Sequence, residues 1–440
     1  MTLSNHFEDF CEEITVGNDE TEKWTERIKK ITQKLNKKYY DSSSGEDNIL
    51  IVGSVGRGTA MHNVSDYDCI FELPSEKFKQ FDNYSGNGQS ALLQEVKKEI
   101  KLSYPTTKVK GDGQVVVVSF IDGDIELVPA FRQSDDNFKY PDSNNGGSWK
   151  KTKPLPEINE AERLTKLIET HYINFCRLMR HWKNEIGFKF KGLLIDTMVK
   201  NFFEEDDDRK NLKYSNYYDS LIDFFKFLSE QNADCAYWYA LGSNQQITNN
   251  DKGKFIKMAK KAYNLLKDIS ANSDDVITKL RELLGKEFAK TVVENKASLS
   301  TRLAPNEELP ESKFIVDVRY NLKLDYTVEQ EGFRPKKMSY FTNNKYKLKA
   351  KKNLNFYIES IDIPDYLLPS VEWYWKVRNI GPEAIRKNCE RGQIRKGSIK
   401  HQESTAFNGE HYVECYAVIG RRMIAKGRAK VPIDITYGID

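Results

Sequence analysis

Short runs of β-branched and apolar residues, separated by a glycine-rich loop, dominate the hydrophobic pattern in the first third of the chain. The first run is 49–52 and the second is 69–71. Continuous apolar runs of this length, bounded by turn residues, predict buried strands. A third run, 115–121, leads through a turn at Asp122-Gly123 into 124–129, so two further strands are predicted there.

Amphipathic helices are predicted around these strands. Apolar residues recur at helical spacing over 18–39, 90–102, 161–185, 254–269 and 274–288. The order strand, loop, strand, helix, strand predicts a core of helices and sheet, and the later helices predict a helical lobe. From about residue 314 onward the chain becomes rich in strand-like alternation, which predicts a separate β domain.

Changes in composition suggest where these parts meet. Glycines and prolines cluster over 146–156, and the stretch 296–312 reads as a linker. We therefore expect an α+β protein with four segments. These are a core with a bracing N-terminal helix (1–155), a helical lobe that closes a cleft (156–295), a linker (296–313) and a basic β-rich domain (314–440).

Two acidic residues stand at the start of the second predicted strand. In a strand, Asp66 and Asp68 point to one face while Tyr67 points to the other. Two carboxylates held side by side repel each other unless a cation lies between them, and Mg²⁺ prefers oxygen ligands of this kind. An Asp-x-Asp pair alone occurs often by chance, so a third carboxylate nearby would strengthen the prediction of a metal site.

Two further features strengthen the metal hypothesis. Asp124 and Glu126 share one face of a neighbouring predicted strand, and one of them can complete the site. Upstream, Gly53-Ser54 opens a glycine-rich turn whose backbone N–H groups and hydroxyl can hold phosphate oxygens. The pattern therefore predicts a metal site beside a phosphate-binding loop.

The stretches GSVGRGTAMHNVSDYDCIFELP, IELVPAF and RLMRHWK resemble the nucleotidyltransferases of bacterial anti-phage signalling. These cyclic-oligonucleotide synthetases are relatives of oligoadenylate synthetase and cyclic GMP–AMP synthase, and the resemblance covers about residues 20–290. It implies a polymerase-β-like sheet with Asp66, Asp68 and Glu126 as the metal-binding triad. Many relatives have Asp where Glu126 stands. Gly53 and Ser54 match the pair that binds the triphosphate.

The resemblance also implies the reaction and its requirements. It implies nucleotidyl transfer between nucleoside triphosphates with two Mg²⁺ ions, or Mn²⁺ in their place, and release of pyrophosphate. The product is a cyclic or linear di- or oligonucleotide, read by a separately encoded effector protein. Arg177, Arg180 and Lys183 would ordinarily be read as a solvated basic stripe on a helix. The resemblance favours Arg180 and Lys183 as contacts to the triphosphate.

The C-terminal segment is basic and aromatic. Residues 341–440 contain 18 Lys and Arg against 11 Asp and Glu, a net charge of +7. Such a face suits a phosphate-bearing or nucleic-acid ligand, but the aromatic residues can equally form a sandwich core, and both readings stay open. The stretches LLPSVEWYWKVRNIGPEA, RGQI and GEHYVECYAV resemble the C-terminal sensor domain of adenylyl, guanylyl and oligonucleotide synthetases. The polar residues of interest there are Arg378, Asn379, Glu383, Arg391 and His411.

Composition limits the setting in which the protein works. The net charge is only +3, the six cysteines show no pairing pattern, and no apolar stretch of membrane-spanning length occurs. We expect a soluble cytoplasmic protein with no membrane association and leave its oligomeric state open.

Two other functions are compatible with the same residues. A template-independent DNA or RNA polymerase, or a transferase that adenylylates protein or RNA, would use the same three carboxylates. A non-enzymatic alternative is a sensor module on an inactive nucleotidyltransferase scaffold, which an intact acidic triad disfavours. The residues leave base, sugar and linkage undetermined.

Overall fold

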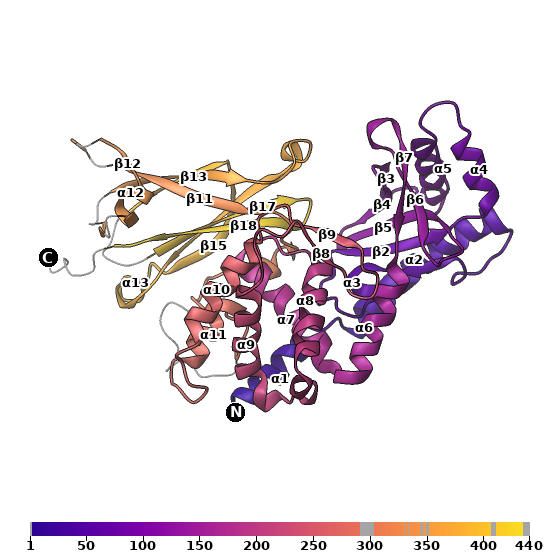
Figure 1. The fold of residues 1–440 in the computed structure, drawn as a ribbon. Coiled ribbons are helices and arrows are strands. Elements are labelled where there is room, and N and C mark those ends of the chain that lie inside the picture. Colours follow the sequence, from indigo (N-terminus) through magenta and orange to yellow (C-terminus); the bar gives the residue numbers. More distant parts are fainter. Residues whose placement is uncertain are drawn as a thin grey trace. The chain divides into compact units, whose positions relative to one another are not determined.

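A computed structural model describes residues 2–290, 303–329, 331–332, 334–343, 346–348, 352–405 and 411–433 (Figure 1). The chain divides into two compact units. The N-terminal unit consists of Cys11–Arg180 and Lys191–Gly253. The C-terminal unit consists of Met1–Phe10, His181–Phe190 and Lys254–Asp440. Helices and sheets are both extensive, which confirms the expected α+β class, whereas the four expected segment boundaries stay predictions.

A seven-stranded mixed sheet forms the centre of the N-terminal unit. Five strands follow the order β1-β2-β5-β4-β3, and β6 pairs with both β5 and β7. All four strands predicted from the apolar runs are present. Their bounds, with those of the remaining strands, are β1 Ile49–Ile51, β2 Asp66–Glu72, β3 Lys108–Asp112, β4 Val115–Phe120, β5 Gly123–Arg132, β6 Phe138–Asp142 and β7 Ser148–Thr152.

Helices of the N-terminal unit follow the predicted amphipathic segments, with one correction. The single helix expected over 161–185 is two helices, because Glu169 has a left-handed φ of 54° that interrupts the first. A small hairpin, β8 Tyr237–Tyr239 with β9 Gln246–Thr248, adds a second sheet. The helices are α2 Asn18–Tyr40, α3 Gly53–Gly56, α4 Ser75–Asp82, α5 Gly88–Ser103, α6 Pro154–Ile168, α7 Thr170–Ile186, α8 Gly192–Glu205 and α9 Tyr217–Ser229, with 3₁₀ turns at Asn144–Gly146, Asp207–Asn211 and Tyr214–Asn216.

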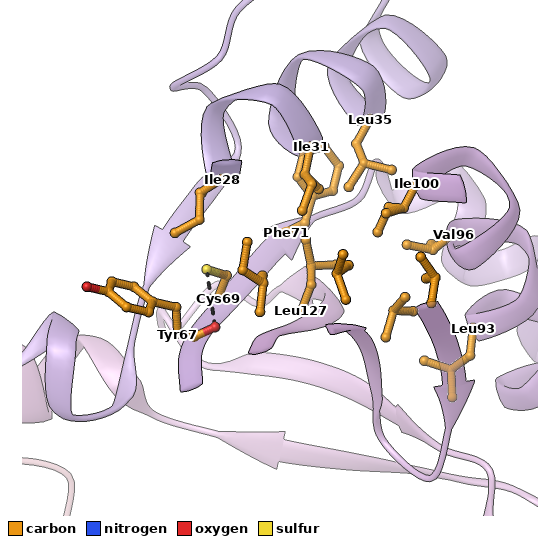
Figure 2. Close-up of a cluster of buried hydrophobic side chains, with 14 of the residues drawn as sticks. Ile28, Ile31, Leu35, Tyr67, Cys69, Phe71, Leu93, Val96, Ile100 and Leu127 are labelled. Atoms are coloured by element: carbon orange, nitrogen blue, oxygen red, sulfur yellow. Dashed lines mark hydrogen bonds between the residues drawn. The ribbon is translucent and has the colours of Figure 1, made fainter. Parts of the chain in front are cut away.

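One hydrophobic core of this unit lies between the sheet and helices α2 and α5 (Figure 2). Alternate residues of β2 point into it, so Tyr67, Cys69 and Phe71 are buried. Figure 2 shows Phe71 and Leu127 directed toward Ile31, Leu35 and Ile100 of the two helices. Because one face of β2 is fully occupied by this core, its acidic residues lie on the other face.

Two sheets that share one apolar core form the C-terminal unit. The five-stranded sheet has the order β10-β18-β17-β14-β15 and the four-stranded sheet the order β12-β11-β13-β16. This is the expected β-rich domain. The strands are β10 Ile315–Val316, β11 Leu322–Glu329, β12 Lys336–Lys337, β13 Asn353–Ile361, β14 Glu372–Asn379, β15 Arg391–Gly397, β16 Lys400–Ser404, β17 His411–Ile419 and β18 Arg422–Val431.

Several helices complete the description of the C-terminal unit. The expected helices over 254–269 and 274–288 are present but shorter than predicted. The bounds are α10 Lys254–Leu266, α11 Val276–Leu284, α12 Met338–Asn343 and α13 Pro382–Arg386, with 3₁₀ turns at Pro310–Ser312 and Leu368–Ser370. Helix α1, Leu3–Glu13, and helix α7 each contribute residues to both units. Of the linker expected over 296–313, residues 296–302 lie outside the described part of the chain.

None of the helices that the structure describes has the length and hydrophobicity needed to cross a bilayer. All six cysteines lie in described parts of the chain, and none of them forms a disulfide bond.

Phe71 tests the importance of the core that supports β2. Replacing Phe71 by Ala should destabilise the N-terminal unit by about 3–5 kcal/mol, since it removes a fully buried ring between the sheet and two helices. Thermal denaturation followed by circular dichroism measures the loss. Ile121, which is 77% exposed, is the matched control, and Ile121→Ala should change the melting temperature little. Equal melting temperatures for both variants would contradict this assignment of the core.

Candidate active site

Parallel pairing of β2 with β5 brings the predicted acidic residues together. In this register Asp66 lies opposite Asp124, and Asp68 lies opposite Glu126. Carboxylate oxygens of Asp66, Asp68 and Glu126 all lie within 4.8 Å of one another, and the three side chains are half-buried. The residue pattern left open whether Asp124 or Glu126 completes the group. In the structure, Glu126 lies with Asp66 and Asp68.

The donor set fits a hard divalent cation. It consists of three carboxylates, which supply the oxygen ligands that Mg²⁺ and Mn²⁺ prefer. Like charges this close repel unless a cation offsets them. The three oxygens therefore form a group that could bind a metal ion, and the identity and number of ions stay predictions.

The glycine-rich loop after β1 lies against this acidic group. Gly53 has a left-handed φ of +63°, and a Cβ built on it would overlap the Asp68 carboxylate oxygen Oδ2. The backbone N–H of Val52 donates to the Asp68 carbonyl at 2.9 Å. Glycine suits position 53 for two reasons: it adopts the left-handed backbone conformation without strain, and its lack of a Cβ leaves room for the Asp68 carboxylate.

Bonds to the Ser54 carbonyl close the loop on itself. The backbone N–H groups of Thr59 and Ala60 donate to it at 2.8 and 3.1 Å. These bonds return the chain toward Ser54 after the short helix α3. The predicted phosphate-binding residues Gly53 and Ser54 are therefore adjacent to the acidic group, and their contact with a triphosphate stays a prediction.

The two predicted cations of α7 are buried and bonded to protein groups. Arg180 is 7% exposed and donates through Nη1 and Nη2 to the Asp196 carboxylate at 2.6 and 2.9 Å. Lys183 is 7% exposed, and its Nζ donates to the Val318 carbonyl at 2.6 Å and lies 3.7 Å from Asp317. Arg180 belongs to the N-terminal unit and Lys183 to the C-terminal unit. Their role as triphosphate contacts stays a prediction of the family resemblance.

Asp196 of α8 is a charged residue to which the sequence reasoning gave no role. It has no exposed surface and accepts hydrogen bonds from Arg57 and Thr59, as well as from Arg180. Arg57 lies in the GSVGRGT stretch, whose pattern predicted a role only for Gly53 and Ser54. The sequence does contain a feature that could have indicated this role, which is a single Asp within the apolar run GLLIDTMV. A charge inside an apolar helix requires buried partners.

The electrostatics of this cluster keep Asp196 ionised. Burial by itself would raise the pKa of the carboxyl group, but the adjacent guanidinium groups of Arg180 and Arg57 lower its pKa to about 2. Arg57 also lies 3.5 Å from Glu157, whose other oxygen accepts a hydrogen bond from Ser243 at 2.9 Å. Two guanidinium groups and two carboxyl groups thus form one buried network.

In the C-terminal unit, part of the positive charge of the tail lies inside the structure. Lys286, Lys376 and Arg378 all reach the buried Glu307 carboxylate, at 2.7, 2.8 and 2.9 Å. Burial opposes ionisation of Glu307, but the lysines lower its pKa to about 2. The positive charge counted from the sequence is therefore not all displayed on a surface.

The other polar and aromatic residues of interest in this unit are distributed between interior and surface. Asn379, His411, Trp375, Tyr412 and Tyr416 are buried. Arg391 pairs with Glu403 at 2.6 Å, and its side chain is 43% exposed. The side chain of Glu383 lies outside the described part of the chain.

Two family models match the sequence. Residues 1–164 match the second messenger oligonucleotide or dinucleotide synthetase domain. Residues 304–434 match the adenylyl/guanylyl and second messenger synthetase C-terminal sensor domain. No curated protein matches the chain.

Solved structures similar to this chain come from several bacteria. The CdnC protein of E. coli MS115-1 with ATP has 18% identity and a TM-score of 0.47, covering 64% of this chain and 98% of that one. The DncV protein of Escherichia coli with 3'-deoxy GTP has 11% identity and a TM-score of 0.45, covering 62% and 92%. A CdnE c-di-GMP synthase from Flavobacteriaceae sp. has 15% identity and a TM-score of 0.42, covering 55% and 80%.

The acidic group and the loop beside it lie within the matched N-terminal domain. Residues 1–164 therefore form a domain of the second messenger oligonucleotide or dinucleotide synthetase family. The C-terminal segment is a sensor domain of the type attached to adenylyl, guanylyl and second messenger synthetases. Both statements confirm the family predicted from the sequence.

Gly53 tests the fit between the loop and the acidic group. Gly53→Ala should weaken Mn²⁺ binding about tenfold or more, because the added Cβ displaces the Asp68 carboxylate. Calorimetric titration with Mn²⁺ measures the change. Gly17→Ala is the matched control, since a Cβ at Gly17 has nothing within 4 Å. Unchanged Mn²⁺ affinity in Gly53→Ala would show that Asp68 is not a ligand held by this contact.

The charge of Asp196 predicts a pH-dependent stability. The pKa of Asp196 is lower in the folded chain, so its contribution is complete above its unfolded value near 4 and is lost as the pH falls through about 2. The stability gap between wild type and Asp196→Asn should narrow by about 1 kcal/mol between pH 5 and pH 3. Thermal denaturation at several pH values measures the gap, and a constant gap would contradict an ionised, paired Asp196.

Proposed function

We propose that this protein joins nucleoside triphosphates into a cyclic or linear di- or oligonucleotide second messenger. The observation that carries the proposal is the group formed by Asp66, Asp68 and Glu126 beside the Gly53-Ser54 loop, inside a matched synthetase domain. A sugar hydroxyl of one nucleotide forms a bond to the α-phosphorus of another. The bond from that phosphorus to the β-phosphate oxygen breaks, pyrophosphate leaves, and the hydroxyl proton is released.

Each residue of the site has a distinct role in this proposal. Asp66 and Asp68 would hold divalent cations that bind the donor triphosphate, and Glu126 would complete the ligand set for the cation that activates the acceptor hydroxyl. Two Mg²⁺ ions, or Mn²⁺ in their place, supply activation of the acceptor hydroxyl and stabilisation of charge on the departing pyrophosphate when bound.

The loop after β1 receives the triphosphate. Backbone N–H groups near Gly53 and the Ser54 hydroxyl donate hydrogen bonds to phosphate oxygens. Arg180 is bonded to Asp196 and Lys183 to the Val318 carbonyl. To contact the triphosphate as predicted, each side chain would have to bind a phosphate oxygen in addition to its protein partner.

The biological setting follows from the two domains together. We propose that the product acts in anti-phage signalling through a separately encoded effector protein, in the cytoplasm, where nucleoside triphosphates are abundant and free thiols persist. The C-terminal sensor domain would bind a phosphate-bearing or nucleic-acid ligand. The sensor-domain match supports a sensing role for this domain, and the basic and aromatic composition of residues 341–440 supports a ligand of this kind.

Product analysis tests the proposal directly. Purified protein is incubated with Mg²⁺ and labelled ribo- or deoxyribonucleoside triphosphates, singly and mixed, and products are resolved before and after phosphatase and nuclease treatment. A discrete di- or oligonucleotide formed without added polymer or protein supports the proposal. Product only with an added nucleic-acid end would identify a template-independent polymerase, and label transferred to protein or RNA an adenylyltransferase. The absence of any product, including with added acceptors, would identify an inactive scaffold.

Glu126 and Asp124 form a matched pair of variants in the same strand. Glu126→Gln should lower the rate of product formation by about 100-fold or more, because a metal-binding carboxylate becomes a neutral amide. Asp124→Asn should retain most of the rate, since Asp124 lies outside the three-residue group. Pyrophosphate release measures both rates. The reverse order of effects would assign the third ligand to Asp124.

A further inference from the structure

The loop that carries Gly53 and Ser54 has two inward-pointing side chains that the proposed chemistry does not use. Arg57 is 8% exposed and Thr59 is fully buried. Arg57 Nε and Thr59 Oγ1 both donate to the same oxygen, Asp196 Oδ2, at 2.9 and 3.0 Å. One buried carboxylate therefore binds the loop at two points.

Asp196 is itself held from the other side by α7. Its Oδ1 accepts from Arg180 Nη1 at 2.6 Å, and Oδ2 accepts from Arg180 Nη2 at 2.9 Å. The same guanidinium also donates to the carbonyls of Cys176 and Gly192, each at 3.2 Å. Bidentate pairs of this kind fix direction as well as distance, so the position of Asp196 between loop and helix is well defined.

A second arginine of α7 binds the end of the loop. Arg177 donates to the Ala60 carbonyl at 2.9 Å and to the Gly58 carbonyl at 3.2 Å. Arg177 also donates to Thr15 Oγ1 at 2.8 Å. Two members of the basic stripe read from the sequence thus act on the loop, one directly and one through Asp196.

We propose that Asp196 is a positioning residue, which holds the Gly53-Ser54 loop in register with the acidic group through Thr59 and Arg57. The inference rests on the proposed function of that loop in binding the triphosphate. Thr59 connects the two regions, because its N–H donates to the Ser54 carbonyl at 2.8 Å and its hydroxyl donates to Asp196. Since Gly53 already abuts Asp68, a small shift of the loop changes the distance between phosphate donors and carboxylates.

Thr59→Val is the sharpest test, because it keeps the shape of the side chain and removes only the hydroxyl. Its matched control is Thr32→Val in α2, where an equally buried hydroxyl donates to the Ile28 carbonyl at 2.9 Å, away from the loop. Asp196→Asn serves as a second variant that removes the charge. Thr59→Ser, which keeps the hydroxyl, should retain the hydrogen exchange and kcat of the wild type.

Two measurements follow each variant of the full-length protein. Hydrogen exchange with mass spectrometry, without nucleotide, should show amides of 53–60 exchanging about tenfold faster in Thr59→Val and Asp196→Asn than in wild type or Thr32→Val. Initial rates of pyrophosphate release should show kcat lowered by about 10- to 100-fold in the same two variants, with a smaller change in KM. A purely structural role would instead lower melting temperatures alike in both Thr variants and leave kcat unchanged.

The outcomes separate this inference from the proposed function. Wild-type exchange over 53–60 in both loop variants, or faster exchange with unchanged kcat, would overturn the role of Asp196. If wild type forms no product while loop exchange still responds to both variants, the proposed function fails and the ordering of the loop by Asp196 stands.

Discussion

Three carboxylates held within 4.8 Å of one another are the constraint on which the rest of the N-terminal unit depends. Left alone, such a group separates, because like charges repel and water solvates each one better apart. The separation is prevented by the sheet, since β2 and β5 are paired along their length and their register fixes the residues opposite each other. The free energy gained by packing the core and pairing the strands thus offsets the repulsion between the three carboxylates.

The two faces of β2 have different roles, because one packs in the core and the other carries the acidic residues. Tyr67, Cys69 and Phe71 fill the core against α2 and α5, while Asp66 and Asp68 face away from it. A shift of one residue in the register would place both acids in the core and expose the apolar residues. The cost of that exchange makes the arrangement of the acidic group insensitive to small disturbances elsewhere.

Buried ion pairs provide a second level of organisation in both units. In the N-terminal unit, Asp196 joins Arg57 and Arg180, and in the C-terminal unit Glu307 joins Lys286, Lys376 and Arg378. Such groups add little stability compared with apolar residues of the same size, but breaking one leaves uncompensated charge. The main effect of these buried ion pairs is therefore to fix the relative position of the segments that they join.

The sequence by itself determined the strands, most of the helices, the β-rich C-terminal domain and the two aspartates, Asp66 and Asp68, of the acidic group. These depend on local alternation and on a motif with fixed spacing, which a single stretch of chain contains. It did not determine whether Asp124 or Glu126 completes the group, because that choice depends on the register between two strands. Nor did it reveal the break at Glu169, where helical periodicity continues across a backbone interruption.

Only the tertiary structure decided where the charges of α7 point. From the sequence, Arg177, Arg180 and Lys183 form an exposed stripe or a triphosphate site, since both have the same spacing. Burial of Arg180 against Asp196 brings together α7, α8 and the loop after β1. No periodicity within one segment encodes such a contact, because its partners lie 16 and 139 residues from Asp196 along the chain and meet only when the unit has folded.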